Sequence, residues 1–364
     1  MINILLLRPM YGNGGIKSWA DKYVQTFPNA EFNIVSVSSV IKAKSADASV
    51  IRRFFVGICE LLVILIRVIR VVKRSKIEIF HATTSGSYGS LRDYVVGYIC
   101  KKQGVKTILH CHYGCMVKYL TEGGIKRRLL MLSLKQYDQI WVLDRTTYNY
   151  LNENVPIAKG RVYITPNSIN VDKIDKIPPK SYCDYAFIAN VLPTKGIFEL
   201  LQAFTSIDDN ELKLHIVGPS SETILKSLNE YTAKDSRIKY YGRVDNNTAI
   251  QYLKGVDALV LPTYFPGEAF PISILEAMSF GKFVISTPRA AIRDMLTSED
   301  GEACGYLVNE QSVSDIVDAI KWCRTNPHLA DDMCERAYAK VYNSYRMDVV
   351  YDLYRNLYRK IIIS

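Results

Sequence analysis

The sequence predicts an α/β fold made of two doubly wound domains, and three observations support this. Short apolar runs of strand length alternate with amphipathic stretches of helix length along almost the whole chain. The alternation is interrupted once, by the Pro- and Lys-rich segment 173–182, and then starts again. At 364 residues, the chain is long enough to bury two cores. Such alternation is typical of a parallel sheet covered on both faces.

The elements of the first half begin with the apolar run 2–8, which reads as a strand buried on both faces. A glycine-rich turn follows, and then an amphipathic helix from about Ile16 to Phe27. The later strands of this half are predicted at 32–39, 77–84, 106–114, 139–144 and 161–168. We therefore expect residues 1–170 to form an N-terminal domain.

The second half repeats the pattern after the linker. Its strands are predicted at 185–191, 212–218, 238–242, 258–263 and 282–288, with helices after most of them. We expect residues 171–345 to form a C-terminal domain and residues 346–364 to form a helix that packs back on the N-terminal domain. Ligands of such sheets bind at the carboxyl ends of the strands, so the loops after strands are the places to search.

Charge is distributed unevenly between the halves. Residues 1–170 hold 24 Lys and Arg against 10 Asp and Glu, whereas residues 171–364 hold 22 against 26. A basic first half suits nucleic acid, anionic lipid or a phosphorylated acceptor. Because no basic and aromatic platform of the RNA-binding type is present, we expect no nucleic-acid partner.

The eight cysteines follow no regular spacing, and the N-terminus lacks the long apolar region of a signal peptide. Reduced thiols and a cytoplasmic location are therefore expected. The segment HCHYGC, residues 110–115, contains ligands of the kind that zinc uses. No second ligand pair stands elsewhere at a zinc spacing, so we expect no metal site.

The stretch 51–76 is a long, basic and amphipathic helix. Its longest uncharged run, 61–66, is far shorter than the ~20 residues that span a bilayer. One interpretation is a cover helix packed on the first sheet. The other adds contact with an anionic membrane through the basic end at Lys73, Arg74 and Lys76.

Two carboxylates stand out in the segment 264–282, where Glu268 and Glu276 flank an almost wholly apolar run. A buried carboxylate is costly unless something pairs with it. Glu268 falls in the loop after the strand 258–263, and Glu276 falls on the second turn of the helix that follows. The alternative is that both acids are solvated at the surface.

The start of that helix offers a seat for an anion. Pro271 suits a first helical turn, and the free N–H groups near Ile272 and Ser273 can bind phosphate. A nucleotide diphosphate sugar matches this order of groups, with sugar hydroxyls at Glu268, pyrophosphate at the helix start and the ribose diol at Glu276. A carboxylate accepts both hydroxyls of a cis diol.

This segment resembles the E-x7-E motif of retaining family 4 glycosyltransferases, which have the GT-B fold. Other segments resemble that family in the same order along nearly the whole chain: Gly14-Gly15, His112 in ILHCHYG, TPNSIN, NVLPTKG, LHIVGP, IKYYGRV and GYLVN. The resemblance implies two Rossmann-like domains facing across a cleft, with the acceptor on the N-terminal side and the nucleotide sugar on the C-terminal side.

The resemblance also assigns roles to single residues. It implies catalytic roles for Glu268, His112 and Lys195, with Lys195 bound to the donor phosphate and His112 near the donor sugar. The residues that it implies for donor binding are Gly14, Gly15, Asn190, Lys195, Phe270, Ile272, Ser273 and Glu276. A lysine at the phosphate meets the main electrostatic need when the C–O bond to phosphate breaks.

One position departs from the family pattern. Asn190 stands where the family has an arginine, so one of two usual cations is missing, and Arg243 or Arg289 is a candidate substitute. Two further histidines lie near strand ends. We expect His110 to point to the face opposite His112 and to be a core residue, and His81 to be either a core residue or a lining residue on the acceptor side.

The leading hypothesis is thus a hexosyl- or N-acetylhexosaminyltransferase without a cofactor. The resemblance implies that it retains the configuration at the anomeric carbon and needs no metal ion. A UDP-sugar is favoured as donor and GDP-mannose is the alternative. The expected acceptor is a saccharide or a polyprenyl-diphosphate-linked saccharide in the assembly of a surface polysaccharide such as lipopolysaccharide, with the enzyme peripheral on the inner face of the membrane. Two alternatives stay open, a nucleotide-sugar hydrolase or epimerase and a non-catalytic sugar-nucleotide-binding subunit. A dinucleotide-dependent oxidoreductase is disfavoured because Lys17 occupies the third glycine position.

Overall fold

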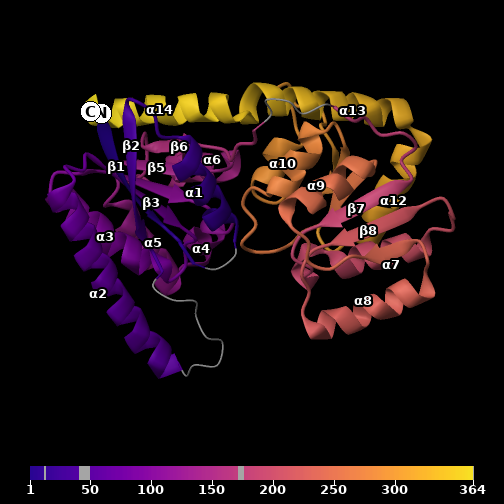
Figure 1. Ribbon diagram of the computed structural model, residues 1–364, viewed down its shortest axis with the longest axis horizontal. Coiled ribbons are helices and arrows are strands. Elements are labelled where there is room, and N and C mark those ends of the chain that lie inside the picture. The colour runs from indigo at the N-terminus through magenta and orange to yellow at the C-terminus, as the bar shows by residue number, and fades with distance from the viewer. Residues whose placement is uncertain (12–13, 41–49, 171–175, 364) are drawn as a thin grey trace. The chain divides into compact units, whose positions relative to one another are not determined.

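A computed structural model of the chain describes residues 1–11, 14–40, 50–170 and 176–363, with the side chains of 50–55 left out. It divides the chain into two compact units, of which the first contains Met1–Asn167 with Tyr351–Ser364 and the second contains Ser168–Val350. Each unit is built on a parallel sheet with helices on its faces (Figure 1), as the sequence predicts.

The sheet of the first unit has the strand order β2-β1-β3-β4-β5-β6, and its neighbouring strands are all parallel. In chain order the strands are β1 (Ile2–Arg8), β2 (Phe32–Ser38), β3 (Ile79–Thr84), β4 (Lys106–Cys111), β5 (Gln139–Val142) and β6 (Val162–Ile164). All six were predicted, although the observed strand β4 ends three residues before the predicted end.

One face of this sheet carries an aliphatic core. Leu5, Leu7 and Leu109 on the strands belong to one buried cluster with side chains from the covering helices. These helices are α2 (Val50–Arg74), α3 (Gly89–Lys102), α4 (Met116–Glu122), α5 (Gly124–Leu134) and α6 (Arg145–Asn154). The interpretation of the stretch 51–76 as a cover helix is therefore confirmed in its packing.

The other face of the first sheet carries an aromatic core, covered by α1 (Gly15–Thr26) and by the C-terminal helix α14 (Met347–Ile363). The hydroxyls of Tyr23 and Tyr358 lie 2.6 Å apart, and the Tyr354 hydroxyl donates to the carbonyl of Pro166 over 3.0 Å. Tyr354 and Tyr358 of α14 are fully buried, so this helix completes the core of the first unit.

The sheet of the second unit has the order β12-β11-β10-β7-β8-β9, again with parallel neighbours. Its strands are β7 (Asp184–Ile188), β8 (Lys213–Val217), β9 (Ile238–Tyr240), β10 (Ala258–Leu261), β11 (Phe283–Ser286) and β12 (Tyr306–Leu307). The chain builds outward from β7 to β9 and then returns to the other side of β7. The topological switch point therefore lies between β7 and β10.

The helices of the second unit begin where the sequence supplies capping residues. The side chains of Ser221, Asp245 and Ser312 each accept a hydrogen bond from a backbone N–H in the first turn of α8, α9 and α12. The helices are α7 (Ile197–Ser206), α8 (Glu222–Lys234), α9 (Asn246–Gly255), α10 (Ile272–Ser279), α11 (Ala291–Met295), α12 (Val313–Thr325) and α13 (Pro327–Lys340), with the short turns η1 (Pro193–Lys195) and η2 (Val341–Tyr345).

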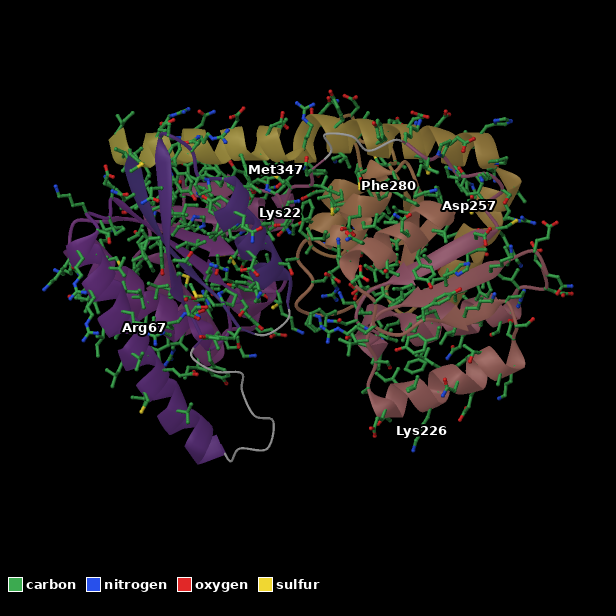
Figure 2. All side chains as sticks on the ribbon, in the orientation of Figure 1. Lys22, Arg67, Lys226, Asp257, Phe280 and Met347 are labelled. Carbon is green, nitrogen blue, oxygen red and sulfur yellow. The ribbon has the colours of Figure 1, made fainter. Side chains whose placement is uncertain are left out.

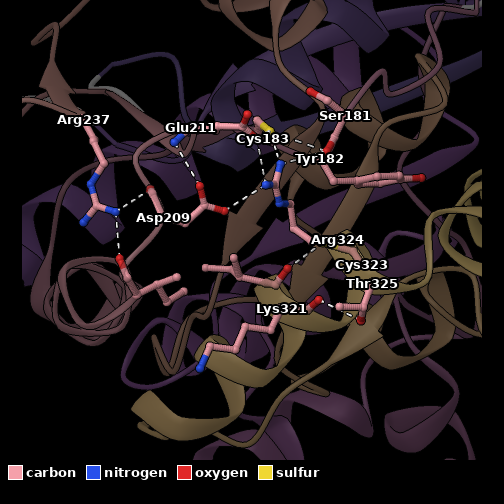
Figure 3. Close-up of polar contacts among 12 residues, drawn as sticks. Ser181, Tyr182, Cys183, Asp209, Glu211, Arg237, Lys321, Cys323, Arg324 and Thr325 are labelled. Atoms are coloured by element: carbon pink, nitrogen blue, oxygen red, sulfur yellow. Dashed lines mark hydrogen bonds and ion pairs between the residues drawn. The ribbon is translucent and has the colours of Figure 1, made fainter.

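Two arginines fasten the amino-terminal edge of the second sheet (Figure 3). Arg324, at the end of α12, lies 2.9 Å from both Asp209 and Glu211 in the loop before β8. Arg237 donates to the carbonyls of Ile207 and Asp209 over 2.8 and 2.7 Å. These contacts hold the edge of the sheet opposite the carboxyl ends of its strands.

All eight cysteines carry free thiols. Among residues 1–11, 14–40, 50–170 and 176–363, no helix is long and apolar enough to cross a membrane.

Candidate active site

The strongest candidate site lies at the switch point of the second sheet. Strands β7 and β10 are parallel neighbours, so the segments after them leave the same edge of the sheet. The turn η1 follows β7 and carries Lys195, and the loop after β10 carries Glu268. The topology therefore brings together two side chains that are 73 positions apart in the sequence.

Lys195 and Glu268 form an ion pair between Nζ and Oε2. Their side chains are only 14% and 9% exposed, so the pair is largely withdrawn from solvent. The Thr263 hydroxyl donates a second hydrogen bond to the same carboxylate oxygen over 3.1 Å. The Lys195 Nζ also lies 5.2 Å from the centre of the Phe265 ring. Removing one member of such a pair leaves the other charge buried and uncompensated.

Gly196 makes this contact possible. Its φ angle is +78°, and a Cβ at this position would lie 2.2 Å from the carbonyl oxygen of Pro262. Only glycine fits there, because a side chain would push the turn that carries Lys195 away from the loop that carries Glu268. A backbone hydrogen bond of 2.8 Å, from the Tyr264 N–H to the Thr194 carbonyl, joins the same two segments.

Sequence reasoning missed two of these residues, Gly196 and Thr263, as parts of the site. The sequence pattern could have identified both residues. Gly196 is the last residue of the TKG turn, and Thr263 is the last residue of the LPT segment that ends a predicted strand. Glu199, in the first turn of α7, was not singled out either; its Oε2 is buried and makes no hydrogen bond within the described part of the chain.

The donor-binding candidates on α10 follow Glu268 in the predicted order. Ile272 and Ser273 are half-buried in the first turn of the helix, and Glu276 is half-buried in the second. Phe270 is buried, with its ring centre 5.3 Å from that of Tyr345. The loop acid, the helix start and the second acid are therefore consecutive features of one short segment.

The position that departs from the family pattern lies just after β7. Asn190 is exposed there. Arg289, one proposed substitute for the missing arginine, already makes two hydrogen bonds of 2.9 and 2.8 Å to the carboxylate of Glu310. Arg243, the other, is exposed in the loop after β9.

His112 belongs to the first unit, directly after β4. It is only 8% exposed, and its backbone N–H donates to the Thr84 carbonyl over 2.9 Å. Its Nε2 is buried and makes no hydrogen bond to any residue that the structure describes. Burial lowers the pKa of His112 to about 3, so the imidazole is neutral at neutral pH. It can exchange a hydrogen bond with a ligand but is a poor source of positive charge.

The expectation that His110 points away from His112 is wrong. The two ring centres lie 4.0 Å apart, because residues two positions apart along an extended chain face the same side. His81 is fully buried on that side, so its interpretation as a core residue is correct. Its Nδ1 lies 2.6 Å from the Tyr358 hydroxyl and its Nε2 lies 3.3 Å from Nδ1 of His110. Burial lowers the pKa of His81 to about 3 and also lowers that of His110.

Gly14 and Gly15 stand at the start of α1. Gly14 has an extended backbone with φ near −179°, and a Cβ on either glycine would meet no atom within 4 Å. Neither the backbone angles of Gly14 nor the packing of the described residues requires glycine there. Trp19, one turn further along α1, has its ring centre 4.7 Å from that of His112.

Over the ranges of the chain given above, no group of three or more His, Cys, Asp or Glu side chains is arranged to hold a metal ion.

Comparison with known proteins adds an independent line of observation. Residues 172–340 match the family described as glycosyl transferases group 1. The N-acetyl-alpha-D-glucosaminyl L-malate synthase of Bacillus anthracis is 25% identical over 60% of this chain and 54% of its own length. The phosphatidyl-myo-inositol mannosyltransferase of Mycobacterium leprae is 29% identical over 43% of this chain and 42% of its own length. The chain thus spans about half the length of these curated relatives.

Solved structures resemble the whole chain in fold. Sucrose-phosphate synthase from Thermosynechococcus elongatus has a TM-score of 0.76 at 17% identity, with all of both chains covered. HepE from Anabaena, solved with UDP and glucose, has a TM-score of 0.71 at 13% identity, covering 99% of this chain and all of the other. The chain therefore has the GT-B fold, and residues 172–340 match the glycosyl transferases group 1 family.

Proposed function

We propose that the protein transfers a sugar from a nucleotide diphosphate donor to a hydroxyl acceptor, with retention at the anomeric carbon. The observation that carries the proposal is the buried Lys195–Glu268 pair at the switch point, next to the start of α10 and inside the region that matches the glycosyltransferase family. The pair offers a cation for a phosphate and an acceptor for a sugar hydroxyl at one place.

In this proposal the donor is bound by successive groups of one segment. Glu276 accepts the ribose diol, the N–H groups at Ile272 and Ser273 face the diphosphate, and Glu268 accepts a sugar hydroxyl. Lys195 stabilises the charge that grows on the leaving diphosphate. His112 contributes a hydrogen bond to the donor sugar as a neutral imidazole, since burial holds its pKa at about 3.

The reaction itself needs no protein base in this scheme. The bond from the anomeric carbon to the phosphate oxygen breaks while the acceptor oxygen approaches the same face of the sugar. The acceptor proton passes to the departing phosphate, so the products are a glycoside and a nucleoside diphosphate. The proposal includes no metal ion, and Lys195 supplies the positive charge.

The donor that we favour is a UDP-sugar, with GDP-mannose as the alternative. HepE, which shares the fold, was solved with UDP and with UDP-glucose, and this supports UDP as the first nucleotide to test. For the acceptor we propose a saccharide or a polyprenyl-diphosphate-linked saccharide in surface polysaccharide assembly, with the enzyme peripheral on the cytoplasmic face of the membrane. A putative teichuronic acid biosynthesis glycosyltransferase of Bacillus subtilis, 26% identical over 42% of this chain, supports this class.

A second candidate function is nucleotide-sugar binding without transfer. It is favoured by Asn190, because the family cation is missing there and Arg289 is already held by Glu310. Hydrolysis or epimerisation of a nucleotide sugar is a third outcome on the same fold.

The experiment has two stages. A thermal-shift screen of UDP, GDP, ADP and their sugars identifies the nucleotide, and Lys195→Met serves as the matched variant. The selected sugar nucleotide, labelled in the sugar, is then incubated with and without saccharide acceptors. Acceptor-dependent formation of a labelled glycoside supports the proposal. Release of free sugar alone would indicate a hydrolase, and binding with neither product would indicate a non-catalytic subunit.

A further inference from the structure

The outer face of α2 exposes several large apolar side chains. From Val56 onward, a group of its apolar side chains is exposed to solvent. Val56, Leu62 and Ile66 are 48%, 54% and 47% exposed. The full apolar group is Val56, Ile58, Cys59, Leu62, Val63 and Ile66. Such a run of exposed large apolar side chains on one helix signals an interaction surface.

The inner face of the same helix is also apolar, and it packs against the core of the first unit. Ile64, Val68 and Val72 are 2%, 0% and 9% exposed and belong to the aliphatic core of the first unit. A helix that is apolar all round is normally buried on all sides. In the described part of the chain, α2 is buried on one side only, so its outer apolar group is not needed for packing on the sheet.

The outer face changes character along the helix. After Ile66 its exposed residues are basic, namely Arg67, Arg70, Lys73 and Arg74. Between 56 and 74 the sequence contains a single acid, Glu60. The outer face therefore has an apolar half followed by a basic half, with almost no negative charge.

The neighbouring helix extends this character. Helix α3 packs against α2 and exposes Leu91 and Tyr98, both 46% exposed. The exposed Lys101 and Lys102 follow at its C-terminal end. Two adjacent helices of the first unit thus present apolar side chains together with lysines and arginines.

We propose that the outer face of α2 docks on an anionic lipid bilayer. The apolar half lies at the boundary of the acyl chains, and the basic half lies among the negative headgroups, as in interfacial amphipathic helices. This deepens the acceptor part of the proposed function, because a surface held at the bilayer receives lipid-linked acceptors. The helix lies on the membrane and does not cross it.

A second copy of the chain fits this face less well. A symmetric dimer through α2 uses the same patch on both subunits, and neither patch supplies the acids that four exposed basic side chains need. Anionic lipid supplies that negative charge. The bilayer is therefore the occupant that matches both halves of the outer face.

This assignment differs from binding by the basic end alone in one measurable respect. Contacts made by lysine and arginine are screened by salt, whereas apolar insertion is not. The outer face of α2 should therefore show a salt-sensitive part that depends on Arg70, Lys73 and Arg74. It should also show a salt-resistant part that depends on Leu62 and Ile66.

The test is flotation of the full chain with vesicles of phosphatidylcholine, with and without phosphatidylglycerol, at low and high salt. Two variants address the two halves, Leu62→Gln with Ile66→Gln, and Arg70→Ser with Lys73→Ser and Arg74→Ser. Matched controls carry the same kinds of change on exposed residues of the second unit, at Leu225 and Leu329 and at Lys226, Lys234 and Lys239. Figure 2 labels Arg67 on α2 and Lys226, one of the control positions, on α8.

The apolar variant is expected to lose binding at both salt concentrations, by about tenfold or more, because two inserted aliphatic side chains are replaced. The basic variant is expected to lose the preference for phosphatidylglycerol and the response to salt. Both controls should float like the wild type. Circular dichroism checks that each variant is folded.

Three results would overturn the inference: wild-type flotation by both variants, equal losses in the controls, or no flotation of the wild type. Self-association in sedimentation that disappears in the Leu62 and Ile66 variant would assign the face to a second copy instead. Calorimetry with UDP separates this inference from the proposed function. Failure to bind UDP with normal flotation counts against the function alone, and UDP binding without flotation counts against the membrane surface alone.

Discussion

The pairing of Lys195 with Glu268 leads to opposite effects for two substitutions at one site. The Lys195 ammonium already has a carboxylate partner, Glu268. In the proposed function, a donor diphosphate therefore competes with Glu268 for Lys195. Replacing Lys195 with Met removes the cation that the diphosphate needs. Replacing Glu268 with Gln keeps the shape of the side chain but removes the competing charge.

The magnitude follows from the burial of the pair. A hydrogen bond to a charged group contributes about 1.5–3 kcal/mol. The Lys195 and Glu268 side chains are only 14% and 9% exposed, so we expect a hydrogen bond from Lys195 to the diphosphate to lie toward the upper end of this range. Lys195→Met should therefore weaken binding of UDP by roughly 10- to 100-fold. Glu268→Gln should leave UDP binding unchanged or make it tighter, because Lys195 is released from its partner.

Calorimetry with the free nucleoside diphosphate measures both effects, and the UDP-sugar is then titrated in the same way. We expect Glu268→Gln to weaken only the sugar-dependent part of the affinity and to lower turnover. Lys195→Met should lower turnover as well as affinity, because charge grows on the phosphate as the bond breaks. Equal weakening of UDP binding by the two substitutions would refute the competition argument, and full turnover in Glu268→Gln would remove it as a sugar ligand.

Three further predictions concern neighbouring features. Glu276→Ala should weaken UDP binding by about 1–3 kcal/mol in calorimetry, and unchanged affinity would remove the assignment to the ribose diol. Gly196→Ala should cost about 1–3 kcal/mol of stability and also weaken UDP binding, because φ is +78° and the Pro262 carbonyl occupies the space of the new Cβ; a wild-type melting temperature would contradict this. Burial lowers the pKa of His112 from 6.5 to about 3. Between these pH values the unfolded chain therefore binds more protons than the folded protein does. The free energy of unfolding should fall by up to about 1.4 kcal/mol per pH unit as the pH drops below 6.5. His112→Gln should make the melting temperature less sensitive to acid in that range, and an identical pH profile would argue against the neutral buried imidazole.

The fold could be predicted from the sequence because its strands are short apolar runs that need no knowledge of their neighbours. The run 2–8 forms β1 with the same bounds, and the E-x7-E segment forms the loop after β10 and helix α10. Strand order is a different kind of information. The contact of Lys195 with Glu268 depends on β7 lying beside β10, which no local pattern specifies.

The less successful predictions have equally specific causes. His110 was assigned to the wrong face although the alternation of an extended chain places residues 110 and 112 on one side. The role of α2 was ambiguous because its apolar residues surround the helix, and hydrophobicity alone does not tell which side a sheet will cover. Gly196 was noted only as part of a motif, since the need for glycine arises from a carbonyl 66 positions further along the chain.

The composition of the first unit affects the order in which the two units can be completed during synthesis. Its core contains residues of the segment 351–364 as well as of the first 167 residues. During synthesis the imidazole of His81 and the phenol of Tyr23 emerge long before Tyr358, whose hydroxyl lies 2.6 Å from each of them. The Gln139 side chain, which donates a hydrogen bond to the Leu357 carbonyl, likewise emerges long before its partner. The second unit is continuous in sequence and is complete before these partners leave the ribosome. The first unit is therefore the later of the two to have all of its residues available for packing, and until then His81, Tyr23 and Gln139 lack these partners.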